Sequence, residues 1–297
     1  MEYKINIKKK AIYLGHKHPV YALAKINQKE FISAGSDGDI IHWSTGEKKE
    51  NRLLAKSKYP IFCLFYYEDI CFAGNQEGQI IITNLISGKS SMVDLDGGSI
   101  FSFAVINDRL YIGTFSGQLY YSPLNNLHTF ESIKIGEKSI RAILYLEKHA
   151  LIAFGLSDQS VQFWNYANMK EIQKKIVHKK SIFSLSIADN RLWAGSMDAK
   201  LSLWSLDNLE LYEIIHAHIG AINSLSFNRS LGLIASASRD KSIKLWNGKD
   251  AELKKVINFK KIKGHERSVN KVLWLNDNSL ISAGDDVQII HWEIDKI

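Results

Sequence analysis

The chain has 297 residues, 45% of them hydrophobic, and a formal net charge of +7 at pH 7. A chain of this length and composition can bury a large core, which excludes an intrinsically disordered protein. Its charged start, MEYKINIKKK, lacks the apolar segment of a signal peptide, and no run of about 18 apolar residues predicts a membrane span.

The positive charge comes mostly from lysines, many of them in doublets scattered along the chain. Proteins that read nucleic-acid sequence depend more on arginine, whose planar fork pairs with bases and phosphates. We therefore interpret the lysines as a solvated surface and expect no nucleic-acid partner. Binding of a polyanion through surface lysines stays open as an alternative.

Six residues separate an acidic residue from a tryptophan, or substitutes for both, in seven places. In chain order the spacing joins Asp37 to Trp43, Glu77 to Thr83, Ser116 to Ser122, Asp158 to Trp164, Asp198 to Trp204, Asp240 to Trp246 and Asp286 to Trp292. A period of roughly 40 residues is typical of repeat architectures.

The sixth repeat displays its strands most clearly. Residues 221–227 and 231–238 alternate apolar and polar side chains at period two, as does the segment that ends at Trp246. Turn-forming clusters separate these runs, and a more polar stretch follows them. Four short antiparallel strands in each repeat of about 40 residues predict an all-β fold of the propeller type.

The arrangement of Gly-His, Ser, Asp and Trp resembles the WD40 repeat family over essentially the whole chain. The resemblance implies one seven-bladed propeller domain spanning 1–297, with four antiparallel strands in each blade. In that family the His, Ser, Asp and Trp of a blade form a structural hydrogen-bond tetrad. That role is carried over to His16, Ser33, Asp37, Trp43, His218, Ser236, Asp240, Trp246, His265, Ser282, Asp286 and Trp292.

The other repeats depart from this pattern to different degrees. Repeat five keeps His178, Asp198 and Trp204 but has Ala194 where the serine is expected. Repeat four keeps only its aspartate and its tryptophan, and repeats two and three have neither the histidine nor the tryptophan. We expect aromatic packing to hold those two blades together.

The two ends of the sequence complement each other. Too few residues follow Trp292 to build an outer strand, whereas residues 2–14 precede the first repeat and alternate like a strand. The N-terminal segment is therefore expected to pair into the last blade and close the ring, as it does in WD40 proteins. The long segment 248–264 is expected to lengthen the turn or outer strand of the sixth blade, and a basic docking element is the alternative.

The two cysteines, Cys63 and Cys71, are too few for a secreted disulfide framework. We expect reduced, partly buried thiols and a cytoplasmic location. Since the two residues fall on successive strands, a cross-strand disulfide is the alternative.

The sequence contains no metal-binding cluster, nucleophile elbow or phosphate-binding loop, and we expect neither a cofactor nor catalysis. Residues near the central channel are aromatic or basic, types that are enriched where proteins bind one another. The partner-binding candidates are Tyr21, Phe62, Phe101, Phe115, Arg141, Phe183 and Arg239.

We predict a monomeric, non-catalytic scaffold that binds a peptide or protein on this propeller face. One alternative is that the aromatic residues merely fill the channel. Another is an enzyme or small-molecule binder whose site lies in the central channel.

Overall fold

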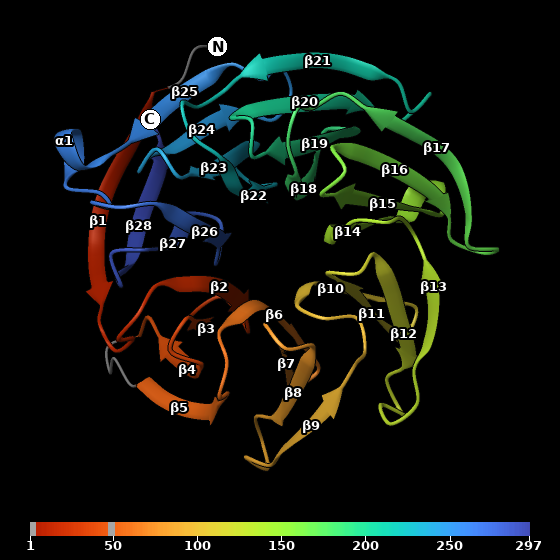
Figure 1. Ribbon diagram of the computed structural model, residues 1–297. Coiled ribbons are helices and arrows are strands. Elements are labelled where there is room, and N and C mark those ends of the chain that lie inside the picture. Colours follow the sequence, from red (N-terminus) through yellow and green to blue (C-terminus); the bar gives the residue numbers. More distant parts are fainter. Residues whose placement is uncertain (1–3, 47–50) are drawn as a thin grey trace.

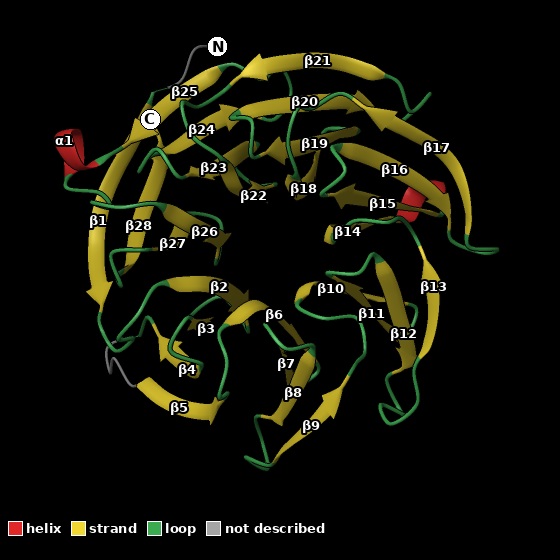
Figure 2. Ribbon diagram, viewed as in Figure 1, coloured by secondary structure: helices red, strands yellow, loops and turns green. Residues whose placement is uncertain are grey.

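The computed structural model describes residues 4–46 and 51–297 and contains seven four-stranded antiparallel sheets. The sheets stand around a central axis like the blades of a propeller (Figures 1 and 2). In blades one to six the chain begins with the inner strand and ends with the outer strand at the rim. The seven-bladed, all-β prediction is therefore confirmed.

The first three blades occupy the N-terminal part of the described chain. Blade one contains β2 (Val20–Lys25), β3 (Glu30–Gly35), β4 (Asp39–Ser44) and β5 (Asn51–Lys56). Blade two contains β6 (Ile61–Tyr67), β7 (Ile70–Asn75), β8 (Gln79–Asn84) and β9 (Ser90–Asp94). Blade three contains β10 (Ile100–Ile106), β11 (Arg109–Thr114), β12 (Gln118–Pro123) and β13 (Glu131–Lys134).

The remaining blades follow in chain order. Blade four contains β14 (Ile140–Leu146), β15 (Leu151–Leu156), β16 (Ser160–Asn165) and β17 (Lys170–Ile176). Blade five contains β18 (Ile182–Ala188), β19 (Arg191–Ser196), β20 (Lys200–Ser205) and β21 (Leu211–His216). Blade six contains β22 (Ile222–Asn228), β23 (Leu233–Ser238), β24 (Ile243–Asn247) and β25 (Leu253–Ile257).

Blade seven combines strands from both ends of the chain. Its inner three strands are β26 (Val269–Trp274), β27 (Ser279–Gly284) and β28 (Ile289–Lys296), and its outer strand is β1 (Ile5–Tyr13). β1 runs antiparallel to β28, with Ile5 opposite Lys296 and Tyr13 opposite Ile289. This pairing confirms the predicted closure of the ring, although residues 2 and 3 of the predicted strand lie outside the described residues.

The hydrophobic core lies between the blades. Seven clusters of buried residues each join side chains of two neighbouring blades. Glycines permit close contact at some of these interfaces: a Cβ on Gly74 would lie 2.5 Å from Ile100, and one on Gly113 would lie 2.8 Å from Ile140. At these two interfaces the glycine of one blade therefore packs against the first inner-strand isoleucine of the next.

The complete tetrads are linked as the resemblance implies. In blade one, Ser33 Oγ accepts a hydrogen bond from Trp43 Nε1 at 2.6 Å and lies 2.6 Å from His16 Nε2. His16 Nδ1 is 3.0 Å from a carboxylate oxygen of Asp37. Blades six and seven have the same links, at 2.8 to 2.9 Å. Each network pairs the indole N–H of a buried tryptophan with an acceptor.

In blade five a serine at a different position completes the tetrad. Ser202 Oγ accepts a hydrogen bond from Trp204 Nε1 at 2.9 Å and lies 2.9 Å from His178 Nε2. Ser202 stands on β20 directly opposite Ala194 on β19. The hydroxyl therefore reaches the same place from the neighbouring strand, and the tetrad is complete in blade five.

Blade four replaces the histidine with residues of its own third strand. Trp164 Nε1 donates to Gln162 Oε1 at 2.9 Å, and Gln162 Nε2 donates to Ser160 Oγ at 3.5 Å. Ser160 Oγ in turn donates to Asp158 at 2.5 Å. The tryptophan and the aspartate are thus connected without an imidazole.

The segment 248–264 forms a short outer strand followed by a helical turn. β25 has only five residues, and the extra residues form α1 (Phe259–Ile262), in which the Asn258 side chain accepts a hydrogen bond from Lys261 N at 3.0 Å. The extra residues were expected in a longer turn or a longer outer strand. They lengthen the connection after the strand as a helical turn and not the strand itself, because the asparagine caps a helix and ends the extended backbone.

Both cysteine thiols are free and buried. Cys63 lies opposite Gly74, and Cys71 lies opposite Tyr66, so the two residues are not cross-strand partners and the alternative of a disulfide does not hold. Within the described ranges, α1 and the 3-10 turn η1 (Glu147–His149) are single turns, and no helix there is long enough to cross a membrane.

Burial and hydrogen bonding set the charge states of the tetrads. Burial lowers the pKa of His178 and His218 below their ordinary value of 6.5. Burial alone would raise the pKa of Asp37, but the hydrogen bonds from His16 and from the backbone of Lys17 outweigh burial and lower it to about 2. The fold therefore favours neutral imidazoles in blades five and six and an ionised Asp37.

Moving the blade-five hydroxyl tests the role of Ser202. Ser202→Ala leaves the groups on His178 and Trp204 without their partner and should lower the free energy of unfolding by about 1–3 kcal/mol. Adding Ala194→Ser restores a hydroxyl at the position used by the other tetrads and should recover most of that loss. Urea unfolding of the parent, both single variants and the double variant measures the effect. An equal cost of Ser202→Ala in both backgrounds would contradict this explanation.

The pKa shifts also predict how stability depends on pH. A group whose pKa is lower in the folded state contributes stability above its unfolded pKa, and this contribution is lost as pH falls. The thermal midpoint should therefore fall below about pH 6.5, as the histidines bind protons in the unfolded chain, and again below about pH 4 through Asp37. His218→Gln should flatten the first decline, whereas His128→Gln, which alters an exposed residue, should not. A midpoint that is constant between about pH 7 and pH 5 would contradict the prediction.

Candidate functional site

A β-bulge in every inner strand creates the ring of residues at the centre. In all seven blades the register between the first two strands skips the second residue of the inner strand. A bulged residue is left unpaired and its side chain is re-aimed. The seven bulged residues are Tyr21, Phe62, Phe101, Arg141, Phe183, Asn223 and Asn270.

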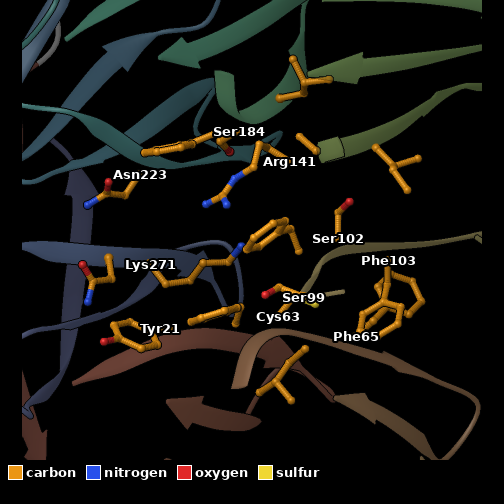
Figure 3. A pocket seen from close by; sticks show the side chains of 18 of the residues that line it. Tyr21, Cys63, Phe65, Ser99, Ser102, Phe103, Arg141, Ser184, Asn223 and Lys271 are labelled. Atoms are coloured by element: carbon orange, nitrogen blue, oxygen red, sulfur yellow. The ribbon is translucent and has the colours of Figure 1, made fainter. Parts of the chain in front are cut away.

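These seven residues line one central cavity of about 850 Å³. Figure 3 shows this cavity with Tyr21, Arg141, Asn223 and Lys271 around it. A cavity of this size is not filled by its aromatic side chains and falls within the range of small-molecule and peptide sites. The aromatic side chains therefore leave an open space at the centre of the ring, whereas one alternative from the sequence was that they fill the channel.

Aromatic side chains and one arginine form a continuous arc along the first five blades. The rings of Tyr21 and Phe62 are 5.9 Å apart, and those of Phe62 and Phe101 are stacked at 5.6 Å. The guanidinium of Arg141 lies 3.7 Å from the centre of the Phe101 ring and 4.7 Å from that of Phe183. Contact between neighbours holds each side chain in place, so the arc is a rigid surface.

The other side of the ring is polar. Asn223 Nδ2 donates to Val269 O at 2.9 Å, and Asn270 Nδ2 donates to Val20 O at 3.0 Å. Each amide thus crosses to the next blade. These asparagines hold the inner strands of blades six, seven and one together.

Lys271 is a cavity residue that the sequence reasoning missed. Six blades have a small residue at the third position of the inner strand, and blade seven has Lys271 there. The small residues are Ala22, Cys63, Ser102, Ala142, Ser184 and Ser224. An alignment of the inner strands at their third position singles out this lysine among six small residues.

The cavity is electropositive. Burial lowers the pKa of Arg141 to about 10 and also lowers the pKa of Lys271. Burial raises the pKa of the nearby Cys63 thiol to about 12, so the thiol stays protonated and supplies no negative charge. The residues that line the cavity include no aspartate or glutamate.

Of the two remaining partner-binding candidates, one lines the cavity and the other does not. Phe115 lines the cavity and is 61% exposed, so it stands at the mouth. Arg239 occupies the equivalent turn of blade six and is exposed, but it does not line the cavity. Two further apolar side chains missed as candidates are exposed at this end of the blades: Met197, on the turn equivalent to that of Phe115, and Ile219, which follows His218.

A second cavity of about 760 Å³ lies at the other ends of the inner strands of blades four, five and six. Its lining combines acidic residues such as Glu147 and Asp189 with basic ones such as Lys148 and Arg229. Its mixed charge distinguishes it from the central cavity. Throughout the described ranges, no group of three or more His, Cys, Asp and Glu side chains is placed to hold a metal ion.

Comparisons with known proteins agree with the geometry. A family model described as the WD domain, G-beta repeat, matches residues 7–44 and 209–247. Apoptotic protease-activating factor 1 of Rattus norvegicus is 23% identical over 86% of this chain and 20% of its own length. A WD repeat-containing protein 55 homolog of Dictyostelium discoideum is 26% identical over 74% of this chain and 55% of its own length. This chain thus spans only part of each relative.

Solved structures show the same fold. The WD40 beta propeller domain of Doa1 superposes with a TM-score of 0.83 at 14% identity, covering 98% of this chain and 97% of that one. A chain of the mitotic checkpoint complex superposes with a TM-score of 0.86 at 14% identity, covering 98% and 93%. The family-model match thus shows WD40 repeats at residues 7–44 and 209–247, and the likenesses to solved structures show that the whole chain has the seven-bladed fold of a WD40 propeller.

Proposed function

We propose that this propeller is a non-catalytic scaffold that binds a peptide or a loop of a partner protein on the face around its central cavity. WD40 propellers generally act as platforms for other proteins. The observation that carries the proposal for this chain is the arc of Tyr21, Phe62, Phe101, Arg141 and Phe183. Tyrosine and arginine in well-packed settings are typical binding hot spots.

Apolar side chains at the same end of the blades extend this surface. Phe115 is 61% exposed, Met197 is 37% exposed and Ile219 is 96% exposed. Large apolar side chains in contact with water favour burial against a partner. The three residues belong to blades three, five and six, so a partner that covers all of them would span the cavity mouth.

The chemistry of the cavity lining favours binding over catalysis. It offers no histidine or carboxylate as a general acid or base. We therefore propose that the ring does not carry an active site. A cytoplasmic location and a monomeric state remain predictions from the sequence.

Removing the exposed apolar side chains tests the docking face. Phe115→Ala/Met197→Ala should reduce the recovery of partners from a native cell extract roughly tenfold, as expected when hot-spot contacts are lost. Ile172→Ala/Ile176→Ala is the matched control because it removes two exposed apolar side chains of the outer strand β17. Circular dichroism establishes that both variants are folded.

Affinity capture followed by mass spectrometry measures the result. Two results would contradict the proposed docking face. The first is that both variants lose the same partners, and the second is that neither variant loses any. The second result would direct the search to the rim segment 248–264.

A further inference from the structure

Two cations enter the central cavity from opposite sides of the ring. Arg141 projects from β14 of blade four, and Lys271 projects from β26 of blade seven (Figure 3). Both side chains line the same cavity, and Figure 3 shows their charged ends pointing into it.

The arginine is held in position but is not paired with a negative charge. The rings of Phe101 and Phe183 contact its guanidinium, at 3.7 Å and 4.7 Å from their centres. Aromatic faces stabilise the charge, but they do not accept the five N–H groups of a guanidinium as carboxylate or phosphate oxygens do. No described residue accepts a hydrogen bond from Arg141.

Lys271 has even fewer interactions. It forms neither a hydrogen bond nor an ion pair with any residue that the structure describes, and burial lowers its pKa. The equivalent position in the other blades is occupied by Ala, Cys or Ser, so packing of the inner strand does not require a long side chain. A lysine at this position costs desolvation and gains nothing structural in return. A purely structural role does not account for it.

The surroundings favour an anion. The lining includes no carboxylate, and a cation beside a protein surface attracts negative charge more strongly than it would in bulk water. The blade-connecting loops at the mouth carry the exposed side chains of Lys17, Lys58, Lys138 and Lys179. Basic side chains around a cavity raise the local concentration of anions and their rate of association.

We propose that the central cavity binds an organic oxyanion, with a phosphate or carboxylate group held between Arg141 and Lys271 and an apolar body against Phe62 and Phe101. The volume of about 850 Å³ exceeds what a bare phosphate fills, and the aromatic arc provides the surface for the body. The anion is either a free small molecule or an acidic side chain of a bound peptide. The site itself does not depend on the proposed partner.

Titration calorimetry on the purified full chain tests the site. Phenyl phosphate is the small-anion probe, phenol is its neutral analogue, and a short peptide of aspartates and phenylalanine represents a protein source. Phenyl phosphate or the peptide should bind at one site per chain at least tenfold more tightly than phenol. Arg141→Gln and Lys271→Met should each weaken that binding at least tenfold.

Lys179→Gln is the control, because it removes an exposed lysine of the mouth and should change the affinity less than twofold. Lys271→Met also has its own test of folding. In a buffer without multivalent anions its thermal midpoint should equal or exceed that of the parent, because a partly buried charge without an ion-pair partner among the described residues is removed.

The outcomes separate the two sources of the anion. Tighter binding of phenyl phosphate identifies a free small molecule, and tighter binding of the peptide identifies an acidic side chain. Absence of binding by both probes, or equal affinity in the parent and both cavity variants, overturns the proposal. Because no partner protein is present, these results are independent of partner capture.

Discussion

Each sheet of this protein must bury both of its faces against neighbouring blades, and the rest of the structure follows from that constraint. An isolated four-stranded blade would expose apolar residues on two sides, whereas seven blades in a ring bury them in seven shared clusters. The arrangement works only when the ring is closed, because an open ring leaves two blade faces and one sheet edge in water. The pairing of β1 with β28 meets this requirement.

The repeat spacing was enough to predict the blades and the closing strand, because strand alternation and the position of the tryptophan depend on local sequence. The polar links were less predictable. In blade five, Ser202 accepts the hydrogen bond of the tryptophan in place of the serine expected at position 194. In blade four, Gln162 stands in for the histidine. A hydrogen bond depends on where the acceptor atom lies in space, and residues at different sequence positions can supply that atom. The helical turn α1 depends on the single capping side chain of Asn258.

The sequence predicted the cavity residues at the second position of each inner strand but missed the one at the third position, Lys271. Tyr21, Phe62 and Arg141 were predicted as channel residues because each follows the first apolar residue of its inner strand, and the β-bulge leaves this second residue unpaired at the cavity. Lys271 follows the bulge at a position where the other blades have small, uncharged side chains, so a charge at this position of the cavity is peculiar to blade seven. The charge of the cavity therefore depends on a residue that the repeat pattern does not mark.

Sharing blade seven between the two ends of the chain has a consequence for biosynthesis. Blades one to six each consist of four consecutive strands, so the strands of each blade can pair soon after they leave the ribosome. β1, in contrast, has no partner until β28 has been made. At about 5–20 residues per second, the 276 residues from Leu14 to Ile289 take roughly 14 to 55 seconds to translate. During that interval β1 presents unpaired backbone groups to the cell. The first strand of the propeller in the chain is thus the last to find its partner.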